Sequence, residues 1–209
     1  MNARITTLTL VLSSLAACVG QGPSYEGGDA SAISDGGVAT DAEGAALQSL
    51  REEEKLAHDV YVALDAQSAA FANIAASEQS HTDAVRALIV RYGFADPAQG
   101  RAAGSFADAT FQSLYGALTA RGATSSVAAL QVGAEIEELD ISDIRAMRME
   151  VTQPDIIATL DNLERGSRNH LRSFWRQLKS AGAGYTPSHL DASTFMAIAE
   201  SPMETGANR

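Results

Sequence analysis

The sequence has little cysteine, little basic charge and no clear strand pattern. Its single cysteine, Cys18, excludes an intramolecular disulfide and a metal site built from several thiolates. No stretch alternates polar and apolar residues for long enough to require a β-strand, and no repeat indicates a solenoid. Residues 42–209 hold 22 acidic and 14 basic residues, a net charge of −8. Because nucleic acid and anionic lipid surfaces attract basic proteins, we expect this acidic domain to dock on neither.

The apolar run near the N-terminus is too short to span a membrane. Arg4 precedes an uncharged segment, residues 5–12, and the sequence LAAC follows at 15–18. This order is typical of a secretory signal peptide, residues 1–17. LAAC resembles the lipobox of bacterial lipoproteins, which implies a mature chain lipidated at Cys18; the alternative is an ordinary signal peptide. The resemblance implies export and anchoring to the cell envelope through lipid alone. In a double-membrane bacterium, the absence of Asp at position 19 favours the outer membrane, on its periplasmic or surface side.

Composition divides the rest of the chain into a tether and one domain. Residues 18–41 are rich in Gly, Ser, Ala and Asp, and they contain too few apolar residues to offset the entropy of ordering, so a flexible tether is expected. The remainder is long enough for one domain with a core. We expect a helical domain over residues 42–190, followed by a short helix and tail over 191–209.

Apolar residues recur at helical spacing in four long segments. The first follows residue 41, the second covers about 68–92 before Gly93, the third begins at 125 or 126, and the fourth covers about 154–182. Shorter helices are expected over 108–121 and around Phe195. These segments predict an all-α protein, an antiparallel four-helix bundle with additional short helices. Candidate N-terminal caps of the long helices are Asp41, Ser68, Ser125 and Thr152.

Each long helix also places an ionisable residue in the middle of its apolar face. A buried carboxylate or imidazole is costly unless it is paired, hydrogen-bonded or bound to a metal, so four such helices indicate that these groups meet. The residues are Glu54 on the first helix, Glu78 and His81 on the second, Glu137 on the third and His170 on the fourth. Neighbouring candidates, as alternative ligands or as partners of the ligands, are Glu53, Glu138, Asp140, Tyr61 and Ser167.

The spacing of Glu78 and His81 has a specific chemical use. Residues i and i+3 project from one helix face, so a carboxylate and an imidazole can reach the same cation. In ferritin-like di-iron and di-manganese proteins, two helices each give a Glu and two give Glu-x-x-His. Here Ser167 stands three residues before His170, where that scheme has Glu. We therefore expect one tight site for iron or manganese and a second that is weak or absent.

Four stretches carry a family resemblance: EEEKLAHDVY (52–61), NIAASEQSHTDAV (73–85), VGAEIEELDISDI (132–144) and GSRNHLRSF (166–174). In this order they resemble the ferritin-like family known as domain of unknown function 2202, over roughly residues 45–190. The resemblance implies a ferritin-like helical bundle and supplies no established reaction. His58 stands where the family pattern has a basic residue.

Two functional hypotheses follow. In the first, an exported, lipid-anchored ferritin-like protein binds iron or manganese through a Glu/His cage, with ferroxidase or peroxide-handling activity open to it. In the second, the same residues form a metal-free buried network, and the protein is a helical module at the cell surface that binds a partner. Whether the protein is an enzyme, and whether it forms homo-oligomers, stays open.

Overall fold

The computed structural model describes residues 37–205, which belong to one compact unit. The expected signal peptide, the lipidation site at Cys18 and the tether up to residue 36 lie outside the described residues. Within 37–205 the chain forms α-helices and one short 3-10 helix, Asp65–Gln67, and no strand. The α-helices are α1 (Asp41–Ala63), α2 (Ala70–Tyr92), α3 (Ala109–Gly122), α4 (Ser126–Arg148), α5 (Pro154–Ser180) and α6 (Ala192–Ala199).

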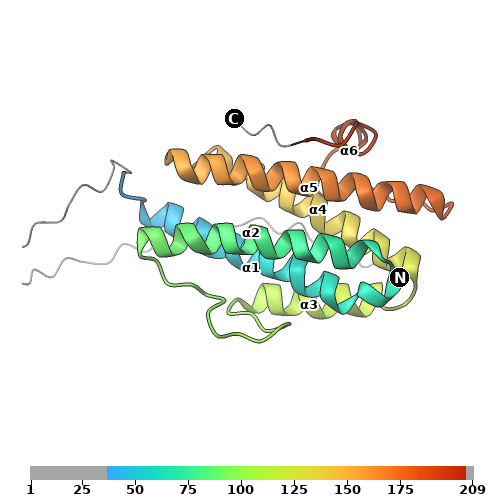
Figure 1. Ribbon diagram of the computed structural model, residues 1–209, viewed down its shortest axis with the longest axis horizontal. Coiled ribbons are helices and arrows are strands. Elements are labelled where there is room, and N and C mark those ends of the chain that lie inside the picture. The colour runs from blue at the N-terminus through green and yellow to red at the C-terminus, as the bar shows by residue number, and fades with distance from the viewer. Residues whose placement is uncertain (1–36, 206–209) are drawn as a thin grey trace, which may run out of the picture. The chain divides into compact units, whose positions relative to one another are not determined.

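The four long helices pack side by side as two hairpins (Figure 1). Helix α1 packs along α2, and α4 packs along α5. Contacts between α1 and α4 and between α2 and α5 join the hairpins, so each long helix touches two others. The short helices lie outside this arrangement: α3 packs against α1 and α4, and α6 packs against α5. The middles of all four long helices can therefore face one interior.

The ends of the helices follow local chemistry, with three differences from expectation. Ser68 is not the cap of α2, because the cap position is Ala69 and no side chain caps it. Helix α1 is capped by Thr40 and not by Asp41, because Thr40 and Glu43 exchange side-chain and backbone hydrogen bonds in a capping box. At the start of α5, Thr152 does not cap the helix. Its backbone N–H and its hydroxyl both donate to Glu43 instead, at 2.8 and 3.1 Å, and Gln153 occupies the cap position. The start of α1 is thus set by a local capping box, whereas Thr152 is held by a residue distant in sequence.

Two apolar layers enclose the middle of the long helices. One is built around the rings of Tyr61, Phe71 and Phe174. The other contains Leu47, Val85, Ile89, Ile144 and Ile156. On α1, Glu54 falls between Leu50 of the second layer and Leu56 of the first, and on α5, His170 falls between Leu163 and Leu171 in the same way. The ionisable residues thus lie between hydrophobic layers that exclude water.

Buried acids on the long helices hold the connecting loops in place. Glu52 accepts hydrogen bonds from the backbone of residues 107 and 108, and Asp59 accepts one from residue 104 at 2.8 Å. Glu138 accepts from the backbone of residues 188–190 and from the hydroxyl of Tyr185. These carboxylates are buried because they replace water for loop amides that would otherwise lack acceptors.

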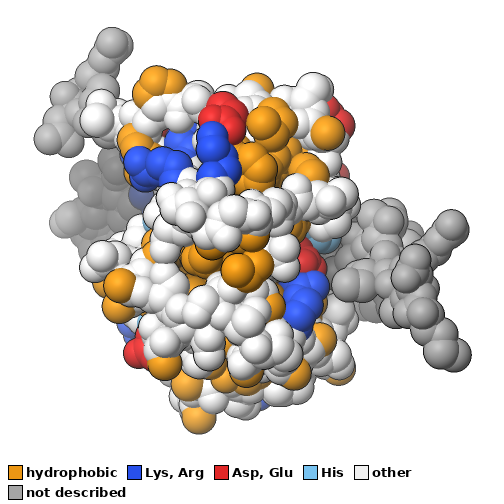
Figure 2. All heavy atoms as spheres, turned by 90° about the vertical axis from the view of Figure 1, so that its right-hand side faces the viewer, with side chains coloured by type: hydrophobic (Ala, Val, Ile, Leu, Met, Phe, Trp, Pro, Cys, Tyr) orange, Lys and Arg blue, Asp and Glu red, His pale blue; other side chains and the backbone are white. Residues whose placement is uncertain are grey.

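No helix in residues 37–205 combines the length and apolar character that a membrane crossing requires. Figure 2 shows one end of the molecule, on which hydrophobic side chains lie in small groups separated by polar atoms and by a few charged side chains. This end therefore presents no single large apolar patch.

Candidate metal centre

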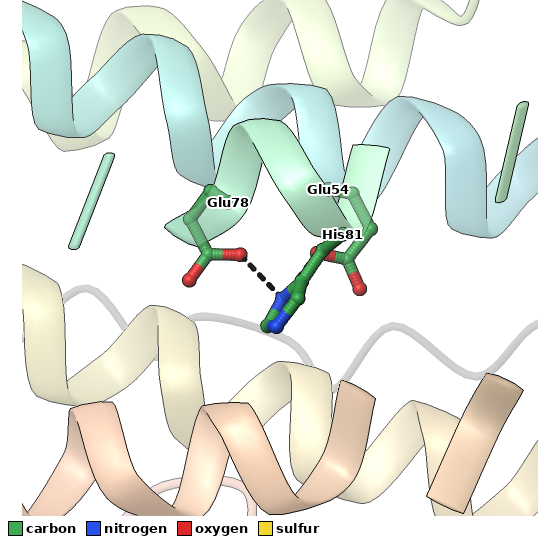
Figure 3. A group of neighbouring side chains, drawn as sticks. All are labelled: Glu54, Glu78 and His81. Atoms are coloured by element: carbon green, nitrogen blue, oxygen red, sulfur yellow. Dashed lines mark hydrogen bonds and ion pairs between the residues drawn. The ribbon is translucent and has the colours of Figure 1, made fainter. Parts of the chain in front are cut away.

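Helices α1 and α2 bring three of the expected ligands together (Figure 3). His81 Nδ1 lies 2.9 Å from Glu78 Oε2 and 3.3 Å from Glu54 Oε2. Both carboxylates are fully buried, and the imidazole is slightly exposed. The i, i+3 spacing on α2 therefore places Glu78 and His81 on one inward face, opposite Glu54 of α1.

Helices α4 and α5 complete a second group around the same glutamate. His170 Nδ1 lies 2.6 Å from Glu78 Oε1 and 3.4 Å from Glu137 Oε2. The contact with Glu78 does not have hydrogen-bond geometry, although the two atoms are close. The nitrogen therefore lies near one oxygen of each carboxylate and closer to that of Glu78.

Glu78 is thus shared by two triads of potential ligands. Glu54, Glu78 and His81 form one, and Glu78, Glu137 and His170 form the other; in each, one ligand atom per residue lies within 4.8 Å of the others. The imidazole rings of His81 and His170 stack with their centroids 5.6 Å apart. The five residues expected from the sequence meet at one place, as two linked triads.

Several of the candidate ligand atoms are buried without a hydrogen-bond partner within residues 37–205. They are both carboxylate oxygens of Glu54, one oxygen each of Glu78 and Glu137, and Nδ1 of His170. Buried polar atoms in native proteins are nearly always satisfied by protein, water or an ion. The pattern of unsatisfied atoms therefore fits a bound cation.

The three carboxylates differ in how readily they ionise. Burial raises the pKa of Glu54 to about 7, although His81 opposes the shift. Burial also raises the pKa of Glu137, against the charge of His170. Burial acts on Glu78 in the same direction, but the charges of His170 and His81 outweigh it and lower its pKa. The shared glutamate is therefore the most firmly ionised of the three.

The two imidazoles are strongly basic when no cation is present. Burial alone would lower their pKa values, but Glu78 with Glu54 raises the pKa of His81 to about 11, and Glu137 with Glu78 raises that of His170 to about 10. At neutral pH the metal-free cluster therefore holds two imidazolium ions among its carboxylates. A metal ion that coordinates these nitrogens must displace their protons.

Two further side chains orient the cluster. Ser77 Oγ lies 3.0 Å from Nε2 of His170, which leaves Nδ1 turned toward the carboxylates. The hydroxyl of Tyr61, which is fully buried, donates to Glu137 Oε1 at 2.6 Å. Tyr61, expected as a partner of a ligand or an alternative ligand, thus contacts one residue of the second triad. Ser77 was not anticipated, because a serine before Glu78 gives no sequence signal of its own.

Gly166 makes room for the ring of His81. A Cβ atom at this position would lie 2.4 Å from His81 Nε2 and 2.6 Å from its Cε1, far inside van der Waals contact. A glycine in the middle of a helix weakens it, so its presence in α5 usually has a packing reason. A glycine within the apolar helical pattern of residues 154–182 is therefore the sequence signal that could have predicted the role of Gly166.

The remaining candidates lie outside the two triads. Ser167 is buried and donates to the carbonyl of Leu163 on its own helix, 3.2 Å away. The carboxylate of Glu138 accepts hydrogen bonds from the loop of residues 185–190, so it does not belong to either triad. Glu53 and Asp140 are buried next to the cluster and belong to neither triad. His58 contacts Asp59 at 2.9 Å, away from the centre.

Fold and site together define an all-helical protein with a buried Glu/His cluster between two helical hairpins. The chain belongs to the family described as uncharacterized protein domain DUF2202, whose model matches residues 43–202. It is 42% identical over 165 residues to uncharacterized protein MJ0754 of Methanocaldococcus jannaschii, which covers 78% of this chain and 89% of the relative. The crystal structure of hypothetical protein MJ0754 from Methanococcus jannaschii superposes with a TM-score of 0.78 at 39% identity, over 83% of this chain and 100% of that one. The helical fold is thus shared with a solved structure.

Proposed function

We propose that this protein binds iron or manganese through Glu54, Glu78, His81, Glu137 and His170. The observation that carries the proposal is the pair of triads sharing Glu78, in which candidate ligand atoms converge within 4.8 Å and several have no hydrogen-bond partner within residues 37–205. The arrangement of the long helices supports a ferritin-like four-helix bundle, in which metal sites are built from side chains on facing helices.

The donor atoms are compatible with iron and manganese. Carboxylate oxygens and imidazole nitrogens suit iron and manganese, whereas sites without sulfur are poor for softer metals. The two triads contain three carboxylates and two imidazoles, and none of the five residues is more than slightly exposed. We expect one tight site and a second that is weak or absent, because Ser167 stands where α5 would otherwise supply a further carboxylate.

The protein groups prepare the site for a cation. Glu78 is held ionised between two imidazoles, Ser77 fixes the orientation of His170, and Tyr61 orients Glu137. The apolar layers on both sides keep the dielectric low and strengthen the attraction between a cation and these carboxylates. Bound iron or manganese would supply redox chemistry with oxygen or peroxide, the basis of a ferroxidase or peroxide-handling activity.

The N-terminal sequence supports a location for this activity. A signal peptide over residues 1–17 and a lipobox ending at Cys18 support an exported protein held at the cell envelope by lipid.

Metal content and metal-dependent stability test the proposal together. Protein stripped by chelation is reloaded with Mn(II), or with Fe(II) without oxygen, and metal per chain and the melting midpoint are measured. For a domain of this size, metal at about 100 times its Kd should raise the midpoint by roughly 5–10 °C. The double variant Glu78→Gln with His81→Ala should show neither bound metal nor the shift.

Glu138→Gln is the matched control. It alters a fully buried glutamate next to Glu137 in the sequence. The carboxylate oxygens of Glu138 accept hydrogen bonds from the backbone of residues 188–190 and not from the centre. It should lower the metal-free midpoint and leave the metal-induced shift intact. A wild-type protein that takes up no metal at neutral pH, and shows no shift, would replace this proposal with that of a metal-free helical module that binds a partner.

A further inference from the structure

Glu53 and Asp140 form a second acidic pair beside the Glu/His centre. Glu53 lies on α1 and Asp140 on α4, and their carboxyl groups are within hydrogen-bonding reach of each other. Glu53 is 5% exposed and Asp140 is 1% exposed. Neither contributes to the two triads, so the centre itself does not account for their burial.

The atoms of this pair are unsatisfied. Both carboxylate oxygens of Asp140 and Oε1 of Glu53 are buried and have no hydrogen-bond partner in the part of the chain that the structure describes. No Lys, Arg or His of that part pairs with either residue. The neighbouring acids Glu52 and Glu138 differ sharply, because backbone amides satisfy their carboxylates. Stabilising a loop therefore does not explain why Glu53 and Asp140 are buried.

The surroundings of the pair add negative charge. Asp140 is close enough to Glu53, Glu54 and Glu137 for each to disfavour its ionisation, and burial is the larger effect in the same direction. Burial and Asp143 do the same for Glu53. Burying a carboxylate without a compensating charge costs several kcal/mol in a protein interior. Only a proton or a cation can offset this cost.

We propose that Glu53 and Asp140 bind a hard divalent cation of the Ca²⁺ or Mg²⁺ class at a site separate from the Glu/His centre. The pair offers oxygen donors alone, and hard cations prefer oxygen ligands, with water completing their coordination. Asp143, three residues after Asp140 and exposed on α4, adds negative charge near Glu53 but forms no ligand group with the pair, so water would supply the remaining coordination. The site shares no ligand with the two triads, so it does not require the proposed transition-metal function.

Calcium is the probe, because it favours oxygen-only sites over sites that depend on imidazole. Metal-stripped wild-type protein should gain roughly 5–10 °C in melting midpoint at Ca²⁺ concentrations about 100 times the Kd. Asp140→Asn and Glu53→Gln, which are nearly isosteric, should each abolish this shift. Both should also raise the midpoint of the metal-free protein, since each removes a buried charge or the need to protonate it.

Glu78→Gln separates this site from the centre. It removes the carboxylate common to both triads and leaves Glu53 and Asp140 unchanged. The Ca²⁺ shift should persist in Glu78→Gln, while any Mn(II) binding that depends on His81 is lost. If Ca²⁺ gives no shift in wild type, the pair is a proton-sharing acid pair and the proposal is wrong. It is also wrong if the shift survives in Asp140→Asn and disappears in Glu78→Gln, because Ca²⁺ then occupies the centre. Failure of the transition-metal proposal would appear separately, as an absence of His81-dependent Mn(II) binding.

Discussion

Replacing Gly166 by alanine tests whether His81 serves a metal centre, without removing any ligand. The new Cβ would lie 2.4 Å from His81 Nε2 and 2.6 Å from Cε1. Since nonbonded carbon atoms settle about 3.5–4.0 Å apart, the ring must move by roughly 1 Å. Its Nδ1 atom would then leave its position 2.9 Å from Glu78 and 3.3 Å from Glu54.

The magnitudes separate packing from metal binding. Alanine in a helix interior stabilises by about 0.5–1 kcal/mol relative to glycine. Overpacking costs about 1–3 kcal/mol, so the metal-free Gly166→Ala protein should lose no more than about 2.5 kcal/mol. A metal at about 100 times its Kd contributes about 2.7 kcal/mol to the wild type, which corresponds to roughly 5–10 °C in the melting midpoint. This metal-dependent part should vanish in the variant.

Two other glycine-to-alanine variants serve as controls in melts with and without Mn(II). At Gly44 a Cβ would lie 2.4 Å from the ring of Phe94, an equally close contact away from the centre. Gly44→Ala should lower the metal-free midpoint and keep the full metal shift. At Gly116, in α3, a Cβ meets nothing within 4 Å, so Gly116→Ala should stabilise slightly and keep the shift. A full metal shift in Gly166→Ala would show that His81 is not a ligand.

Three further predictions concern protons, a buried hydroxyl and the lipid anchor. The metal-free protein should lose stability as pH rises from about 6.5 toward 10, at a slope on the order of 1–3 kcal/mol per pH unit, in urea titrations at several pH values. Folding raises the pKa of His81 to about 11 and that of His170 to about 10, from an ordinary value of 6.5. The stability that these two protonated imidazoles contribute is therefore complete below pH 6.5 and is lost as the pH passes their pKa values in the folded protein. A free energy of unfolding that does not change with pH would contradict these ion pairs. Tyr61→Phe should lower the free energy of unfolding by about 1–3 kcal/mol, because it leaves a buried oxygen of Glu137 without its donor, and an unchanged urea midpoint would refute this. Cys18→Ala should abolish lipid labelling and membrane retention in cells, and unchanged labelling would exclude the lipobox.

The sequence predicts much of the helical fold and the central residues of the site. Helix α2 ends at Tyr92, and the next residue, Gly93, has a φ of 75°, which suits glycine. This end was expected from the glycine that follows the apolar pattern of the helix. The five residues of the two triads were predictable because each interrupts a 3.6-residue apolar stripe in the middle of a long helix. Their convergence then required only that the four stripes face one interior.

The direction of flanking side chains could not be predicted in this way. Adjacent residues on a helix point about 100° apart, so Glu137 and Glu138 were both candidates. Which of the two reaches the centre depends on the loop at 185–190. Backbone amides of this loop donate hydrogen bonds to Glu138, although the loop is about fifty residues away in the sequence. Thr152 was misassigned as a cap for the same reason, since its partner Glu43 lies on another helix. Local patterns do not contain these distant partners.

Sharing Glu78 between the triads has a consequence for how the fold comes apart. Glu54, Glu78 and His81 belong to the α1–α2 hairpin, whereas Glu137 and His170 belong to the α4–α5 hairpin. A cation held by both triads would act as a removable cross-link between segments on the order of a hundred residues apart. A cross-link that closes so long a loop removes more conformational entropy from the unfolded chain than one that closes a short loop. The two hairpins would then separate only after the metal leaves, so the rate of metal release would set the lifetime of the folded domain.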